Sequence, residues 1–567
     1  MYYQAKYQDF IDDNARIMLD EGTDFIDDNF FIIDSNNCKN IESKLYGFVI
    51  KDKTLLGFKK DYNQHIDKNE YGSYINIINK NKRIIIEQDA AGSYGLFLYK
   101  KDNYFAISNS FYYLVLYLNK NRKLTIDIDF YNYYMYEAMS SRSITKTPVE
   151  EITQIDKDMR IVIDKANNSI DLIRDKPQQH IYPIDSKECF EILDKWFSKY
   201  CSFILSLYKN KNHIEMTLSG GKDSRIILTM FNHLNLLSKI IVSSSTEQTD
   251  RSKIDFTIAS HLAKRYNFQL NKEKIIPKNT FSPEIDIFYT LLTELGTQKE
   301  LYFLNGYHLQ PLFSFGGLGG EFIQNTWRSS QEDYIKNYVY NLENVNGISP
   351  KYLTNIIRES FSYLQNIPHE NIGTELHNYT WIKTHYGKSI AHLLLRNDYH
   401  ISPLLDPQLQ LIQNTSYNND DDLLLHAIIY QRYMPDVLNI PFDSNLLTES
   451  AKKQADIIQK KYPKHIEIID NFTLDFGERI IPEDEEVQEP PQKILLKFFH
   501  SNEVYNFSNY FFNEKLYPYC ILQTQKKRMH MNFSDPNTLA ALCILTKTIL
   551  SNSFNFNEYI HQVIKKH

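Results

Sequence analysis

The segment Leu218-Ser219-Gly220-Gly221-Lys222-Asp223-Ser224-Arg225 decides how the middle of the chain folds. It follows an apolar run at 214–218, which predicts a buried strand, and it opens a stretch at 223–236 whose apolar spacing predicts a helix. Two glycines at such a turn let the backbone bend tightly and bring its N–H groups close to an anion. The segment therefore predicts a phosphate-binding loop in a doubly wound α/β unit.

The polar residues of this loop suit a nucleotide. The hydroxyls of Ser219 and Ser224 can donate to phosphate oxygens, and the positive end of the following helix adds up to ~2 kcal/mol. Asp223 repels an anion, so its presence predicts a Mg²⁺ ion that bridges the carboxylate and the phosphates. The alternative is a chance Gly-Gly turn in which Ser or Asp merely caps a helix.

The alternation of strand and helix continues beyond the loop. A second apolar run at 240–242 is followed by an amphipathic stretch at 254–266. Strands separated by helices predict a parallel sheet with crossover helices. A long helix at 186–207 precedes this unit. The chain becomes mainly helical beyond about residue 330 and ends in a helix that opens at Asp535-Pro536, an N-cap and N1 pair.

The first ~175 residues have a different pattern, in which short apolar runs alternate with turn-forming residues. The runs predict strands at 46–50, 75–78, 84–86, 96–99 and 104–107, with a hairpin turn at 79–82. A further strand pair, 124–128 and 160–164, brackets a helix at 131–138. These patterns predict a layered α+β domain over 1–175, an α/β domain over 186–475 after a polar linker, and a mainly helical extension over 476–567.

Composition restricts the class of protein. The 567 residues carry 63 Lys+Arg and 70 Asp+Glu, a net charge of −7, which argues against sequence-independent nucleic-acid binding. At roughly 100–200 residues per domain, the length fits about three domains. Five scattered cysteines without a CxxC pair argue against a zinc ribbon and fit a reducing compartment. No apolar window is long enough to span a bilayer. We expect a cytoplasmic protein without a membrane partner.

The loop resembles the PP-loop of ATP pyrophosphatases, written SGGxDS. The matching residues are Ser219, Gly220, Gly221, Asp223 and Ser224. It is not a Walker A loop, which needs a longer spacing between its first glycine and the Gly-Lys pair. The resemblance implies an adenine nucleotide alpha hydrolase-like fold that binds ATP and Mg²⁺.

Domain order and further segments resemble the asparagine synthetase family. The loop lies behind a β-rich domain, as in that family. The segments that resemble family motifs are 86–92, 97–99 and 106–109 in the N-terminal domain, the Gly-rich 315–322, the PFLD-like 402–407 and the LPxxIL-like 433–438. The resemblance implies an Ntn-like, class II glutamine amidotransferase-like N-terminal domain. It also places Gly316 and Gly317 near AMP, Glu321 beside Asp223 on Mg²⁺, and the backbone of Leu218, Val242 and Ser243 around adenine.

The sequence departs from the family at three places. Tyr2 stands where glutamine-using members carry the nucleophilic Cys, so we expect no glutaminase activity. The positions of the family's Glu and Arg before PFLD fall on Tyr399 and Ile401, for which the nearby Asp398 and Arg396 could substitute. No Lys follows the LPxxIL-like segment. Lys222 could supply the positive charge instead, or it could be a solvated surface lysine.

The resemblance implies an ATP-dependent ligase that forms AMP and pyrophosphate. It would adenylate a small-molecule or peptide carboxylate and transfer the acyl group to ammonia or an amine, with Lys222 and Asp398 as the catalytic candidates. The sequence leaves open whether the protein forms a homodimer. Two alternatives remain: a degenerate relative that binds a nucleotide without turnover, and a PP-loop RNA-modifying enzyme, against which the acidic charge balance weighs.

Overall fold

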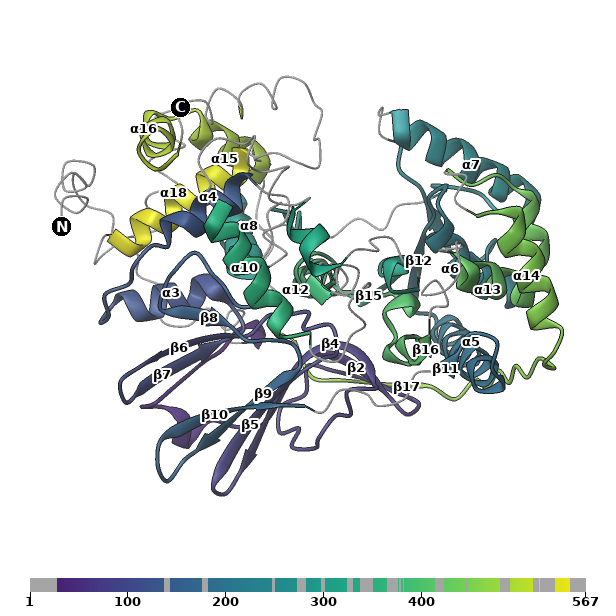
Figure 1. The fold of residues 1–567 in the computed structure, drawn as a ribbon. Helices are drawn as coiled ribbons and strands as arrows, with labels where there is room; N and C mark the ends of the chain where they lie inside the picture. The colour runs from purple at the N-terminus through teal and green to yellow at the C-terminus, as the bar shows by residue number, and fades with distance from the viewer. Residues whose placement is uncertain are drawn as a thin grey trace.

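The computed structural model describes most of the chain. The described residues are 28–136, 143–175, 182–246, 250–272, 282–296, 301–323, 330–336, 350–364, 376, 379–380, 382–413, 423–443, 447–479, 490–512, 520 and 536–550. They form a mixed α/β protein in which antiparallel sheets come first and a smaller, all-parallel sheet follows among helices (Figure 1).

Two antiparallel sheets form the N-terminal part. The first has the order β1-β7-β6-β8, from β1 (Ile32–Asp34), β6 (Phe97–Lys101), β7 (Tyr104–Ser108) and β8 (Ile152–Gln154). The second has the order β10-β9-β5-β4-β2-β3-β17, from β2 (Lys44–Lys51), β3 (Thr54–Gly57), β4 (Tyr71–Lys80), β5 (Arg83–Gln88), β9 (Met159–Asp164), β10 (Ser169–Arg174) and β17 (Thr473–Phe476). All neighbours are antiparallel except β17 and β3, which run parallel.

The two sheets pack face to face because alternate apolar residues point from each sheet into one core. Ile33, Leu98 and Ile107 of the first sheet share a buried cluster with Ile86 and Ile161 of the second. The outer face of the first sheet is covered by α3 (Phe111–Asn119) and α4 (Ile128–Tyr136), which pack on the strand residues Phe97, Tyr99 and Ala106. Figure 1 shows these layers at the lower left.

The strand predictions for this part are confirmed with one exception. The runs at 46–50, 75–78, 84–86, 96–99, 104–107 and 160–164 lie in or overlap β2, β4, β5, β6, β7 and β9, and β4 and β5 form the predicted hairpin. The strand predicted at 124–128 is wrong. Ile126 makes a single bridge to Val149, and α4 begins at Ile128 because Asp127 caps the helix by accepting from Phe130 N at 2.8 Å.

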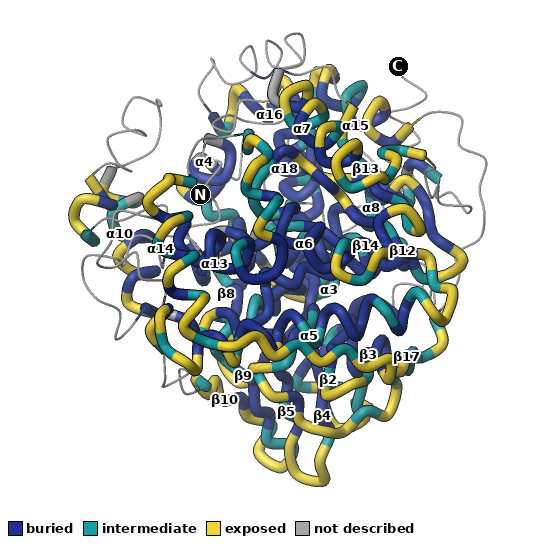
Figure 2. Tube along the Cα trace, turned by 90° about the vertical axis from the view of Figure 1, so that its right-hand side faces the viewer, coloured by how far each residue is buried: buried dark blue, intermediate teal, exposed yellow. Residues whose placement is uncertain are grey.

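The parallel sheet has the order β13-β12-β14-β15, and all its pairs are parallel. Its strands are β12 (His213–Thr217), β13 (Ile241–Ser243), β14 (Leu312–Phe315) and β15 (Asp398–Ile401). The crossover helices are α6 (Lys222–His233) and α7 (Asp250–Tyr266), so the predicted strand-helix alternation is confirmed. Figure 2 shows α6 as a largely buried element, as expected for a helix between a sheet and other helices.

Long and short helices complete the described fold. The predicted helix at 186–207 is α5 (Lys187–Lys209), which Ser186 caps by accepting from Cys189 N. The remaining elements are η2 (Cys38–Asn40), β11 (Tyr182–Pro183), α8 (Pro283–Glu294), η4 (Gly320–Ile323), α10 (Pro350–Ser362), the π-helix η6 (Ile382–Gly387), α12 (Lys388–Leu395), η7 (Pro403–Leu405), η8 (Pro407–Leu411), β16 (Ile412–Gln413), α13 (Leu424–Tyr433), η10 (Pro435–Asn439), α14 (Glu449–Gln459), α15 (Pro491–Phe499), α16 (Asn502–Phe511) and α18 (Pro536–Leu550).

The C-terminal helices pack on the N-terminal part. α15, α16 and α18 lie beside α3, α4 and α8 and share their apolar core (Figure 1). The apolar run that begins at Leu539 is buried in this core. Within the described ranges, no helix combines the length and apolar character that crossing a bilayer requires. The polar linker predicted at 174–180 begins at the last residue of β10, and its residues 176–180 lie outside the described part of the chain.

Candidate functional site

The predicted phosphate loop lies at the carboxyl edge of the parallel sheet. β12 ends at Thr217 and α6 begins at Lys222, so residues 218–221 form the turn between them. Leu218 N donates to Ser243 O at 2.8 Å, which fixes the start of the loop beside the end of β13. Ligands of open α/β sheets bind at this edge, where the strands end and helix N-termini point outward.

The loop is held by a dense set of internal hydrogen bonds. Ser219 N donates to Ser224 Oγ, the two serine hydroxyls lie 3.1 Å apart, and Gly221 N donates to Ser219 Oγ at 3.2 Å. Gly220 N donates to Asp255 Oδ1 of α7 at 3.0 Å. A carboxylate of α7 therefore already accepts from one of the loop N–H groups.

The second Gly-rich segment lies directly against this loop. A Cβ on Gly317 would lie 2.5 Å from Ser224 N, and a Cβ on Gly320 would lie 2.0 Å from Asp223 Oδ1. The contact at Gly317 is with backbone atoms, so glycine is required there, whereas a side chain at position 320 would have to displace the carboxylate of Asp223. The structure thus brings the segment from Gly316 to Gly320 and the N-terminus of α6 together at one place.

Asp223 is anchored from two sides. His426 Nε2 of α13 lies 2.8 Å from Asp223 Oδ1, and Lys222 Nζ lies 3.7 Å from Asp223 Oδ2. Burial favours the neutral carboxyl, but the hydrogen bond and charge of His426, together with Lys222, outweigh burial and hold the pKa of Asp223 below its ordinary value. Burial lowers the pKa of His426 more than the hydrogen bond and charge of Asp223 raise it, and its Nε2 donates to the carboxylate.

The described residues fit a Mg²⁺ ion with one protein carboxylate. Mg²⁺ is commonly held by one or two carboxylates plus substrate phosphates, and Asp223 offers a negatively charged oxygen whose partner oxygen His426 orients. The backbone of Glu321 lies in η4 next to Asp223, but its side chain lies outside the described part of the structure. The described residues contain no group of three or more potential His, Cys, Asp or Glu ligands.

Asp398 lies away from the phosphate loop. It is the first residue of β15, at the amino end of a parallel strand, whereas the loop is at the carboxyl edge. It pairs with Arg396 at 3.1 Å and accepts from Ser314 Oγ at 2.5 Å. Ser314 Oγ also lies 3.0 Å from His400 Nδ1, so Asp398 reaches the carboxyl edge through these two residues.

Other predicted residues have backbone roles around the loop. Val242 O accepts from Asn271 N at 2.9 Å, and Ser243 O accepts from Leu218 N. Gly316 N donates to Ile401 O, and Gly316 O accepts from Ser402 Oγ at 3.2 Å. The PFLD-like segment that contains Ser402 therefore supports the second Gly-rich segment.

Besides Asp255 and His426, two further residues near the loop were not predicted from the sequence. Arg225 is buried beneath it, donates to Gly220 O and to Ile440 O, and stacks over Phe442 at 3.8 Å. It ties the loop to the chain after the LPxxIL-like segment. Tyr430 OH of α13 donates to Lys222 O. The only sequence feature that could have predicted Arg225 is a charged residue in the first turn of an otherwise apolar helix. No feature of the sequence pointed to Tyr430.

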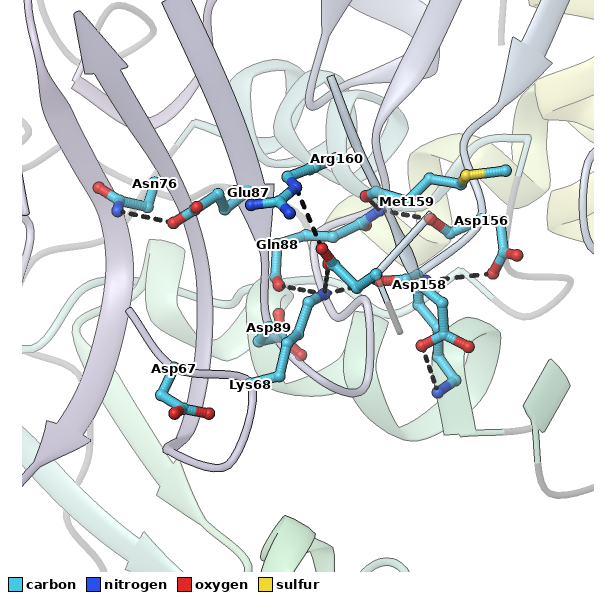
Figure 3. Close-up of polar contacts among 12 residues, drawn as sticks. Asp67, Lys68, Asn76, Glu87, Gln88, Asp89, Asp156, Asp158, Met159 and Arg160 are labelled. Carbon is cyan, nitrogen blue, oxygen red and sulfur yellow. Dashed lines mark hydrogen bonds and ion pairs between the residues drawn. The ribbon is translucent and has the colours of Figure 1, made fainter. Parts of the chain in front are cut away.

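A second polar cluster lies in the N-terminal part, around the family-like segment 86–92 (Figure 3). Lys68 Nζ donates to Gln88 O and Lys157 O, both at 2.7 Å, and Gln88 Nε2 donates to Asp156 O at 2.7 Å. Burial is the main cause that lowers the pKa of Lys68. Asp89 accepts from Tyr74 N, Ala91 N and Ser93, so it organises the turn after β5. Tyr2 lies outside the described residues.

Comparison with known proteins adds no identification. No protein-family model matches this chain, and no curated protein sequence matches it.

Proposed function

We propose that this chain is an asparagine synthetase-like ligase that uses ATP and Mg²⁺ and forms AMP and pyrophosphate. In this proposal the parallel sheet is a PP-loop unit, and the N-terminal sheets are an Ntn-like domain without glutaminase activity. A substrate carboxylate attacks the α-phosphate of ATP, pyrophosphate leaves, and an amine then displaces AMP from the acyl group to form an amide. Such a ligase would work in the cytoplasm, where ATP is supplied.

The observation that carries the proposal is the convergence of the two Gly-rich segments at the sheet's carboxyl edge. Gly317 and Gly320 pack against Ser224 N and Asp223, although about a hundred residues separate the two segments. A Gly-Gly turn before a helix can arise by chance. A second glycine segment that packs on the first turn of that helix provides the close backbone approach that a nucleotide site needs.

Each loop residue has a defined task in this proposal. The N–H groups at the start of α6, with Ser219 and Ser224, bind phosphate oxygens and position the α-phosphate for attack. Lys222 adds a positive charge next to Asp223. His426 holds the carboxylate of Asp223 in place. A bound Mg²⁺ would neutralise charge that develops on the leaving pyrophosphate.

One observation favours the degenerate, non-catalytic alternative. Gly220 N already donates to Asp255, and the hydroxyls of Ser219 and Ser224 pair with each other. A loop whose donors are satisfied internally gains less from a phosphate, because binding must first break those hydrogen bonds. In this alternative, ATP binds weakly or not at all and no pyrophosphate exchange occurs.

The test is ATP–pyrophosphate exchange with Mg²⁺ and a panel of amino acids and dicarboxylates. We expect exchange in the wild-type protein and a loss of at least ~100-fold in Asp223→Asn, because the metal and its charge are lost from the phosphates. Asp456→Asn, an exposed position on α14, is the matched control and should keep full exchange. Exchange that survives in Asp223→Asn contradicts the metal assignment, and ATP binding without any exchange supports the degenerate alternative.

A further inference from the structure

One face of the parallel sheet carries a row of polar side chains. Glu215 of β12 is the register partner of Ser314 in β14, and Ser314 is the register partner of His400 in β15. Residues paired directly across parallel strands lie on the same face, and Asp398, two residues before His400, joins them. The opposite face carries Phe313 and Tyr399, which stack on each other at 5.6 Å.

The hydrogen bonds in this row fix the orientation of His400. Ser314 Oγ donates its single proton to Asp398 Oδ1 at 2.5 Å, so the hydroxyl can only accept from His400 Nδ1, 3.0 Å away. The proton of the neutral imidazole is therefore on Nδ1, and Nε2 carries a lone pair. Arg396 pairs with Asp398 at 3.1 Å, so the carboxylate that accepts from Ser314 is itself held in place.

His400 Nε2 is a buried atom that lies beside Gly316 of the second Gly-rich segment and has no hydrogen-bond partner among the described residues. His400 is 7% exposed to solvent. A Cβ on Gly316 would lie 3.0 Å from Nε2 and 3.0 Å from Thr217 Oγ1, while the next residue, Gly317, packs on Ser224 N. Burial lowers the pKa of His400, more than Asp398 raises it, which keeps the ring neutral.

We propose that His400 is the general base for amide formation, an inference that rests on the proposed function. The amine nitrogen attacks the acyl carbon of the acyl-adenylate, and a C–N bond forms. The C–O bond to AMP breaks, and AMP leaves with that electron pair. The proton that the nitrogen loses goes to His400 Nε2. Ser314 and Asp398 are positioning residues that hold the tautomer. Adenylation itself needs no proton transfer to His400.

The experiment separates the two half-reactions with the full chain. The carboxylate that gives the fastest ATP–pyrophosphate exchange in the wild type is used with two amines, ammonium and hydroxylamine. We expect His400→Gln to keep exchange within about threefold and to lose at least ~100-fold in ammonia-dependent amide formation. Hydroxylamine is a stronger nucleophile that depends less on a base, so hydroxamate formation should stay within about tenfold of the wild-type rate.

Controls distinguish a base from a merely structural residue. Ser314→Ala keeps the imidazole but no longer fixes its proton on Nδ1, and it should lower amide formation by about tenfold. His392→Gln changes another buried histidine outside the row and should alter neither half-reaction. Equal loss of exchange and amide formation in His400→Gln, or an unchanged amide rate, overturns the inference. Absence of exchange in the wild type overturns the proposed function, and the inference with it.

Discussion

His392 shows at the scale of one residue how burial makes stability depend on pH. It lies on α12 at 3% exposure; neither ring nitrogen makes a hydrogen bond among the described residues, and Nδ1 lies 3.6 Å from Glu294 Oε1. Burial, and then the charges of Arg396 and Lys388, lower its pKa to about 3. The unfolded chain binds a proton below an ordinary pKa of about 6.5, whereas the folded chain does not.

This difference predicts acid sensitivity that one substitution relieves. Between pH 6.5 and pH 5, about 1.5 pH units, His392 costs the folded state about 2 kcal/mol, and the loss grows until the pH reaches its folded pKa. Urea unfolding measures the effect. Between pH 7 and pH 5, the free energy of unfolding should fall by about 2 kcal/mol less in His392→Leu than in the wild-type protein. His261→Leu, an exposed position on α7, should leave the pH dependence unchanged. The same fall in both variants contradicts the prediction.

Single residues also mark the limit of what the sequence could predict about the site. Asp223, Ser224 and the loop glycines stand next to one another in the chain, so a short pattern was enough to predict them. His426 and Asp255 contact the same loop from other helices, 203 and 35 positions away. Their partners depend on how α13 and α7 pack, which no local spacing records. Asp398 was predicted as a direct participant, and the structure connects it to the site only through Ser314 and His400.

At the scale of elements, the sequence predicts individual strands and helices better than it predicts which strands pair. The crossover units were predictable because each strand and the helix that follows it are local patterns. β17 was not, because it has only four residues, Thr473–Phe476, and pairs with a strand more than four hundred positions earlier. The error at 124–128 has a local cause, since the Asp127 cap starts a helix within an apolar run that resembles a strand.

A buried ion pair joins α13 to α5 and predicts a large effect of one substitution. Arg432 donates to both carboxylate oxygens of Asp194, at 2.7 and 2.5 Å, and both side chains are nearly inaccessible to solvent. Tyr433 OH also donates to Asp194. Arg432→Met leaves the carboxylate buried without its cation and should destabilise the fold by about 3–5 kcal/mol. Urea unfolding followed by circular dichroism measures the loss.

The matched control lies on α5, the helix that carries Asp194. Lys187 and Glu191 form an exposed i,i+4 pair on α5, and Lys187→Gln should leave the unfolding midpoint unchanged because solvent screens this pair. If Arg432→Met is as stable as Lys187→Gln, the ion pair does not hold α13 in place. His426 and Tyr430 belong to α13, so the Arg432 variant should also weaken ATP binding.

At the scale of the whole molecule, the N-terminal sheet and the parallel sheet share one core. Phe48 of β2 packs on Tyr399 of β15 at 5.7 Å, and Phe476 of β17 packs on Tyr399 at 4.9 Å. Tyr71 of β4 accepts from Ser402 N at 2.7 Å. Since Ser402 in turn donates to Gly316 O and Leu318 O, the N-terminal part supports the second Gly-rich segment of the candidate site.

This connection predicts that one hydroxyl in the N-terminal sheet affects the proposed ATP site in the other part. Tyr71→Phe leaves the buried Ser402 N–H without an acceptor and should destabilise the protein by about 1–3 kcal/mol. ATP–pyrophosphate exchange should fall as well, because Ser402 positions Gly316. Tyr74→Phe is the matched control: it lies on the same strand, is equally buried, and its hydroxyl has no partner among the described residues. Removing the Tyr74 hydroxyl should be neutral or slightly stabilising and should leave exchange unchanged. If Tyr71→Phe and Tyr74→Phe have equal effects, the two sheets share a core, but the N-terminal sheet does not support the candidate site.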